Sequence, residues 1–203
     1  MSQTLFLLSP ANLRGVRAKQ LLSPRAEFSA ARAYRSPDGV PIEDAFSFMS
    51  ALYFRGKVAY ARRFASVLDE GASGAFVIAP GFGLVPLGWR LTPERVKRLR
   101  RIPVDPRRPA YRKPLNDAAK LLAERLPSDA KVVLLGSVAT GKYVDILWPL
   151  FGDRFRFPRA FAGIGDMSRG ALMLRAAASG EELEYVPLDA QRSKARGARL
   201  ARG

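Results

Sequence analysis

The stretch from Lys131 to Tyr143, KVVLLGSVATGKY, constrains the fold of this chain more than any other. Val132 to Leu135 are apolar without alternation, which is typical of a strand covered on both faces. Two glycines and small polar residues follow, and Tyr143 to Leu150 then returns to helix-like spacing. The order strand, loop, helix predicts half of a βαβ unit. Because ligands of open α/β sheets bind beyond the carboxyl ends of the strands, we expect a site at Gly136 to Lys142.

This loop resembles the phosphate-binding P-loop in every position except the last. Tyr143 stands where that motif has Ser or Thr, whose hydroxyl helps to hold Mg²⁺, so a magnesium-dependent nucleotide triphosphatase is the least favoured interpretation. Two others remain open. The backbone N–H groups of the loop bind a phosphate or a base without metal, or the glycines serve only a tight turn. The candidate ligand-binding residues of the loop are Gly136, Ser137, Thr140 and Lys142.

Length and composition predict a single domain, over residues 1–188. With the strand, loop and helix order above, we expect an α/β domain of three layers with a mostly parallel central sheet. The 203 residues contain no cysteine and no histidine, which excludes disulfides, thiolate chemistry and imidazole bases. Proton transfer is left to carboxylates, Lys and Tyr. We predict no cofactor and no metal. No apolar run is long enough to span a membrane, so we expect a cytoplasmic protein without a membrane partner, whose oligomeric state the sequence does not indicate.

The net charge of +16 and the sequence pI of about 11.0 predict a polyanionic partner, and we expect nucleic acid, DNA in particular. Residues 90–113 carry ten Lys and Arg against two acidic residues. A solvated basic arm and an Arg-rich genome composition are the alternative explanations of this charge. Residues 189–203 are Arg-rich and poor in bulky apolar residues, which predicts a disordered basic tail. The candidate nucleic-acid-binding residues are Arg14, Arg17, Arg55, Lys57, Arg95, Arg98, Arg100, Arg101, Arg107, Arg108 and Arg112.

The remaining elements follow from periodicity and from turn and cap residues. Gly56 lies inside the longest predicted helix and indicates a kink, a close approach or a break near Tyr53 to Gly56. Asn12 and Asp166 are predicted to cap the helices that follow them. Strands are predicted at 4–9, 75–79, 131–135, 154–157 and 182–187, and helices at 13–22, 24–35, 43–68, 94–101, 114–126, 143–150 and 166–178.

Five short motifs are shared, in the same order, with known proteins. They are LFLLSPAN, ALYFRGKVAY, VIAPGFGLVPL, LLGSVATGKYVD and FAGIGDMSRGALMLR, which together span most of residues 4–178. They resemble a bacterial family of uncharacterised function and, more distantly, the YaaA peroxide-stress proteins. That resemblance implies an α/β fold akin to the uracil-DNA glycosylases and an association with DNA under oxidative stress. Asn12 stands where the YaaA pattern has lysine, and the histidine motif of the glycosylases is absent.

Three interpretations of function follow. The first is a nucleic-acid-binding protein of the YaaA-like class, linked to DNA protection or repair under oxidative stress. The second is a base- or nucleotide-processing enzyme, similar to a glycosylase, that uses a carboxylate in place of histidine; Asp166 is its candidate catalytic residue. The third is a metal-free nucleotide-binding module or phosphotransferase. Besides the loop residues above, the candidate ligand-binding residues are Asn12, Gly81, Ser168 and Arg169.

Overall fold

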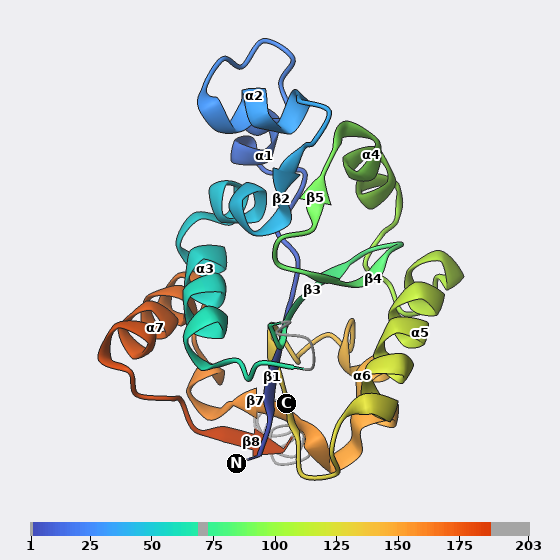
Figure 1. Ribbon diagram of the computed structural model, residues 1–203, viewed down its shortest axis with the longest axis vertical. Helices are drawn as coiled ribbons and strands as arrows, with labels where there is room; N and C mark the ends of the chain where they lie inside the picture. The colour runs from blue at the N-terminus through green and yellow to red at the C-terminus, as the bar shows by residue number, and fades with distance from the viewer. Residues whose placement is uncertain (1, 69–72, 188–203) are drawn as a thin grey trace, which may run out of the picture.

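The centre of the structure, a computed structural model that describes residues 2–68 and 73–187, is a six-stranded sheet. The strand order is β4-β3-β1-β6-β7-β8, so the first strand of the chain lies in the interior (Figure 1). β1, β3, β6 and β7 run parallel, and β4 and β8 pair antiparallel at the two edges. The bounds are β1 Thr4–Leu8, β3 Ala75–Ala79, β4 Gly83–Pro86, β6 Lys131–Leu135, β7 Phe155–Pro158 and β8 Tyr185–Pro187. A separate ribbon pairs β2, Val40–Pro41, with β5, Arg90–Leu91.

Seven α-helices are found in the described residues, together with two short 3₁₀ helices. The α-helices are α1 Val16–Leu21, α2 Ser29–Arg35, α3 Ile42–Phe64, α4 Pro93–Arg101, α5 Pro109–Arg125, α6 Val144–Phe151 and α7 Asp166–Ser179. The 3₁₀ helices are η2 Gly152–Arg154 and η3 Arg159–Phe161.

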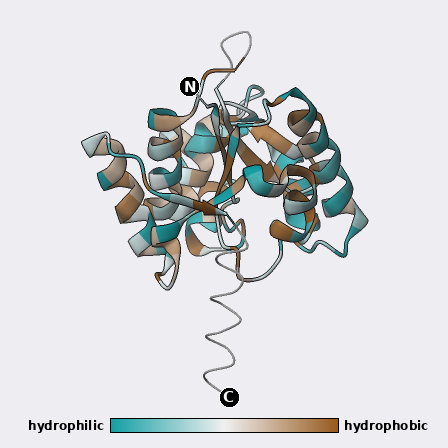
Figure 2. Ribbon diagram, turned by 90° about the horizontal axis from the view of Figure 1, so that it is seen from below, coloured by the Kyte–Doolittle hydropathy of each residue, from teal (hydrophilic) through white to brown (hydrophobic). Residues whose placement is uncertain are grey.

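The inner strands are apolar at successive positions because helices cover both faces of the sheet. In β1, Phe6 and Leu8 belong to one core cluster with residues of α3 and α7, whereas Leu5 and Leu7 belong to a second cluster with residues of α5 and α6. Figure 1 shows α3 and α7 on one side of the strands and α5 and α6 on the other, and Figure 2 shows hydrophobic strands between these helical layers. The predicted α/β class with a mostly parallel central sheet is confirmed.

The long helix α3 is bent, and its second half packs closely on α7. The bend lies at Ala51, whose backbone angles (φ 46°, ψ −123°) are not helical. Beyond it, Gly56 faces Gly170 of α7, and a Cβ on Gly56 would lie 2.5 Å from the Gly170 carbonyl oxygen. The sequence predicted a kink or a close approach near Gly56. Gly56 supplies the close approach, and the kink lies five residues earlier.

Helix starts differ most from the sequence predictions. The first helix begins at Val16 and not at residue 13, because the Asn12 side chain accepts a hydrogen bond from the Arg14 backbone N–H (2.9 Å) and closes a local turn. α5 begins at Pro109, since proline suits a first helical turn and Tyr111 of that turn is buried. Gly165, and not Asp166, occupies the cap position of α7.

Three short strands, β2, β4 and β5, have no counterpart among the predicted elements. β4 follows β3 after a turn in which Gly81 has φ 82°, and it ends at Pro86, a residue that β-sheets tolerate at an edge. The tail predicted at 189–203 lies outside the described residues.

Candidate functional site

The parallel strands end at one edge of the sheet, which we call the carboxyl edge. Ser9 follows β1, Gly81 lies in the turn after β3, Gly136 follows β6 and η3 follows β7. The Ser9 backbone N–H donates to the Leu135 carbonyl (3.2 Å), which keeps Ser9 beside Gly136. A Cβ on Gly136 would lie 2.9 Å from the Ser9 Cβ, so glycine at this position makes room for the serine.

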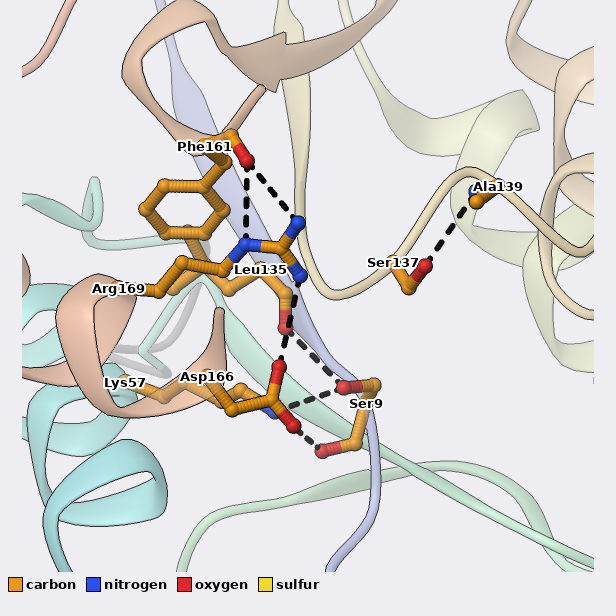
Figure 3. Close-up of polar contacts among 8 residues, drawn as sticks. All are labelled: Ser9, Lys57, Leu135, Ser137, Ala139, Phe161, Asp166 and Arg169. Atoms are coloured by element: carbon orange, nitrogen blue, oxygen red, sulfur yellow. Dashed lines mark hydrogen bonds and ion pairs between the residues drawn. The ribbon is translucent and has the colours of Figure 1, made fainter. Parts of the chain in front are cut away.

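The side chain of Lys57, in α3, extends to the end of β1 at the carboxyl edge. Its Nζ donates to the Ser9 Oγ (2.7 Å) and to the Ser9 carbonyl (3.0 Å) (Figure 3). The Ser9 Oγ lies 3.3 Å from the Leu135 carbonyl, which accepts its proton in one rotamer of the hydroxyl. Lys57 is 1% exposed and Ser9 is 6% exposed. A lysine and a serine are thus in direct contact inside the protein.

The charge of Lys57 is poorly compensated. Among the described residues, Lys57 forms no ion pair, and its Nζ lies 3.9 Å from the centre of the Tyr53 ring. Burial lowers the pKa of Lys57 to about 7, a shift that Asp166 opposes and Arg169 adds to. Lys57 is therefore a buried amine that exchanges its proton near neutral pH.

Two buried tyrosines complete the surroundings of Ser9. Burial raises the pKa of Tyr53 to about 12, with the nearby Asp166 adding to the shift and Arg169 and Ser9 opposing it. Burial also raises the pKa of Tyr143, and Ser9 again opposes the shift. The Tyr53 hydroxyl has no hydrogen-bond partner of good geometry within the described part of the chain. Ser9 and Arg169 are the polar side chains that face this hydroxyl.

Asp166 and Arg169, at the start of α7, lie beside Ser9 and Lys57 (Figure 3). The Arg169 guanidinium donates to the Phe161 carbonyl (2.9 and 3.2 Å) and pairs with Asp166 (3.5 Å). The Asp166 side chain is 67% exposed and that of Arg169 is 15% exposed, so Asp166 faces solvent and Arg169 lines the interior. We call Ser9, Tyr53, Lys57, Tyr143, Asp166 and Arg169 the Ser9 cluster.

The loop from Gly136 to Lys142 lies next to the Ser9 cluster but turns away from it. The Ser137 Oγ accepts from the Ala139 backbone N–H (3.3 Å), and Figure 3 shows Ser137 apart from Asp166 and Arg169. Thr140 and Lys142 are exposed. Gly141 has φ 67°, and a Cβ there would meet Asp145, so this glycine is required by the turn. Of the predicted ligand-binding residues, Arg169 belongs to the Ser9 cluster and Gly136 packs against Ser9. Ser168 is exposed, one residue before Arg169. The Asn12 side chain closes its own turn and does not take part.

Basic residues from distant segments gather at the same edge. Arg98 of α4 donates to the Gly81 carbonyl (2.7 Å) and lies over the Phe82 ring (4.5 Å). Arg14 donates to the Arg100 carbonyl (3.3 Å), which joins the loop after β1 to α4. A hollow of about 440 Å³ opens beside them, lined by Leu22, Pro24, Tyr34, Arg35, Pro93, Val96, Lys97, Arg100 and Arg101. We call Arg14, Lys97, Arg98, Arg100 and Arg101 the basic surface.

The other predicted nucleic-acid-binding residues are dispersed. Arg17 contacts the Phe48 carbonyl (3.4 Å), Arg95 contacts the Arg90 carbonyl and lies over the Trp89 ring (4.3 Å), and Arg107 pairs with Asp105 (2.9 Å). Arg55, Arg108 and Arg112 are exposed. Lys57, which the sequence predicted on an exposed basic face, is buried against Ser9 and does not face solvent as a phosphate contact.

Sequence reasoning missed the contact between Ser9 and Lys57. A signal was present, because Lys57 lies four residues after Tyr53 and three before Tyr60, on the apolar face of α3. A lysine on the buried face of a helix needs a polar partner, and a serine at the end of a buried strand is a suitable one.

Comparisons of the chain with protein-family models, with curated proteins and with solved structures find no match. Within residues 2–68 and 73–187, no helix combines the length and apolarity needed to cross a membrane. The same residues contain no group of three or more acidic side chains arranged to hold a metal ion.

Proposed function

We propose that this protein binds nucleic acid, DNA in particular, across the carboxyl edge of its sheet. The observation that carries the proposal is the junction of two distant basic segments, in which Arg14 contacts the Arg100 carbonyl at 3.3 Å. It brings the charge of the loop after β1 onto the same surface as that of α4. Phosphate groups supply most of the affinity in such an interface, because cationic side chains release the counterions of the nucleic acid.

The charge distribution supports this surface over the rest of the molecule. α4 carries five basic residues and one acidic residue within nine positions, and the hollow beside it has Lys97, Arg100 and Arg101 at its wall. The apolar residues that line this hollow also suit the face of an unstacked base. We include in the proposal a sheet of the uracil-DNA glycosylase type and a role in protecting or repairing DNA under oxidative stress, both of which rest on the YaaA-like motifs.

The test is a titration of a labelled DNA duplex at several salt concentrations. If about six phosphates are neutralised, the slope of log affinity against log salt is near −5. Replacing Lys97, Arg100 and Arg101 together by alanine should weaken binding and bring the slope to about −2 to −3, because about three phosphate contacts are lost.

The matched control is a triple alanine variant of Lys120, Arg125 and Lys131, which removes the same charge from exposed positions on α5 and at the opposite end of β6. It should leave most of the affinity in place. Equal loss in the two triple variants would show attraction by net charge alone, and absence of binding by the unmodified protein at low salt would remove the proposal.

A base- or nucleotide-processing enzyme is a second candidate, favoured by the exposed Asp166 carboxylate above the interior Arg169. In this proposal Asp166 assists departure of a flipped base. Incubation with duplexes that contain uracil, hypoxanthine or an oxidised base should then yield abasic sites that disappear in Asp166→Asn. Intact DNA from every substrate would leave only the binding function.

A further inference from the structure

We propose that Ser9 and Lys57 form a nucleophile and general-base pair that hydrolyses small, uncharged carboxylic esters or amides at the carboxyl edge. The proposal is independent of nucleic-acid binding. It starts from the contact of 2.7 Å between the Lys57 Nζ and the Ser9 Oγ. The amine is the donor in this contact, and in the neutral amine the Nζ lone pair is within reach of the Ser9 proton once the hydroxyl turns from the Leu135 carbonyl.

The geometry divides the roles between the two residues. Ser9 lies at the end of β1 on the carboxyl edge and is 6% exposed, whereas Lys57 reaches it from α3 and is 1% exposed, so we assign the nucleophile to Ser9 and the base to Lys57. The second hydrogen bond of Lys57, to the Ser9 carbonyl, fixes the amine in one orientation. The backbone and the side chain of the same serine therefore hold the amine against the Ser9 Oγ.

The protonation state of Lys57 suits the role of a general base. Burial lowers the pKa of Lys57 toward neutrality, so a large share of the amine is unprotonated near neutral pH and has a lone pair for the Ser9 proton. The charged and titratable groups that face the pair are Tyr53 of α3, Tyr143 before α6, and Asp166 and Arg169 of α7. Burial raises the pKa of both tyrosines, which therefore stay neutral and can donate hydrogen bonds.

The chemistry balances without a metal or cofactor. Lys57 takes the Ser9 proton while the Ser9 Oγ forms a bond to the carbonyl carbon, and the ammonium then gives this proton to the departing alcohol or amine as its bond to carbon breaks. Water attacks the resulting acyl-serine as Lys57 accepts one of its protons, and Lys57 then returns this proton to the Ser9 Oγ as its bond to the acyl carbon breaks. The product leaves as the carboxylic acid, which loses its proton to solvent. The Tyr53 hydroxyl, which lies close to Ser9, is the candidate donor to the carbonyl oxygen.

The surroundings define the substrate class. Asp166 and Arg169 pair with each other beside Ser9, so together they offer no net charge to an ionic substrate at the reacting centre. The small exposed fraction of Ser9 admits a narrow acyl group and excludes a large one. An uncharged short-chain ester or amide meets both conditions.

The test uses a biotinylated ethyl fluorophosphonate, an uncharged probe that forms a phosphorus–oxygen bond with an activated serine and releases fluoride. The full-length protein should carry one adduct, located on Ser9 by peptide mass spectrometry and absent from Ser9→Ala. Lys57→Met, which keeps the length of the side chain, should slow labelling by on the order of 100-fold. Ser128→Ala and Lys131→Met, both at exposed positions, should label at the unmodified rate.

The pH profile of the unmodified protein provides a second readout that needs no variant to fold. The labelling rate should rise about tenfold or more between pH 5.5 and 8.5, because the neutral amine is the base. An unlabelled Ser9, a rate that is unchanged over this range, or a folded Lys57→Met that labels at the unmodified rate would each show that Lys57 only closes the end of β1 as a structural group.

Discussion

Glu43 and Arg62 lie 19 residues apart in the same helix, and yet their side chains form a two-pronged ion pair with distances of 2.7 and 3.0 Å. In a straight helix their backbones would be separated by about 28 Å. The bend at Ala51 removes this separation and turns the two halves of α3 toward each other. It also directs the second half, which carries Lys57, at the end of β1.

The bend predicts an unusual effect of glycine. Ala51 has a positive φ of 46°, a conformation that favours glycine. Ala51→Gly should therefore raise the free energy of unfolding by about 1 kcal/mol, although glycine within a helix ordinarily lowers it by a similar amount. Ala59→Gly, in the regular part of α3, is the matched control and should lower it by about 1 kcal/mol. Urea unfolding of the two variants checks both signs, and a loss in Ala51→Gly would mean that the bend is not strained.

The close contact between Gly56 and Gly170 predicts that replacing Gly56 by alanine lowers the stability of the protein. Helix propensity favours Gly56→Ala by about 1 kcal/mol, but the new methyl group would lie 2.5 Å from a carbonyl oxygen of the neighbouring helix. Backbone cannot yield as a side chain does, so the clash should dominate and lower stability by about 1–3 kcal/mol. Gly88→Ala, where a Cβ meets nothing within 4 Å, should change stability by no more than about 0.5 kcal/mol. Thermal unfolding distinguishes the two, and equal melting temperatures would contradict the close packing.

Lys57 predicts a pH dependence of stability. Its pKa is about 7 in the folded protein and 10.5 in its ordinary environment, so between these values the unfolded chain binds the proton that the folded protein releases. Stability should therefore rise with pH across this window, by up to about 1.4 kcal/mol per unit, and become level below pH 7. The difference in unfolding free energy between the unmodified protein and Lys57→Met isolates this contribution. Measurements from pH 6 to 9.5 suffice, and a difference that is constant over the range would show that Lys57 stays charged.

Arg169 and Lys142 predict contrasting effects of removing a cation. Arg169→Ala should lower the free energy of unfolding by about 1–3 kcal/mol, because it leaves the Phe161 carbonyl without its two donors and separates η3 from α7. Lys142→Ala removes an exposed charge and should stay within about 0.5 kcal/mol. Chemical denaturation checks both, and a neutral Arg169→Ala would indicate that the carbonyl is rehydrated.

The sequence predicted the elements whose pattern depends only on burial. β1, β3 and β6 were found because a strand covered on both faces is apolar at each position, and α4 because Thr92 caps it and Pro93 opens it. β4 was missed because it has four residues at an edge of the sheet, where local preferences are weak. The bend at Ala51 has no sequence signal, since alanine is the residue that best favours a straight helix.

The candidate site was predicted only in its position at the carboxyl edge. The loop after β6 and the start of α7 were expected there, and Arg169 and Asp166 do lie beside the strand ends. The spacing of Lys57 on the apolar face of α3 indicated a buried polar contact, but its partner Ser9 is 48 residues away and the contact depends on the bend of α3, so the sequence could not identify the pair. The basic surface was predicted as a charge excess, but its extension from α4 to Arg14 required the tertiary structure.

The interior place of β1 has a consequence for synthesis of the chain. β1 is made before both of its parallel partners, which are residues 75–79 and 131–135. At roughly 5–20 residues per second, on the order of ten seconds pass before both partners have been made. During that interval the apolar segment LFLL has neither neighbour and is open to association with other nascent chains or to capture by a chaperone. β7 and β8, which continue the sheet beyond β6, are made later still.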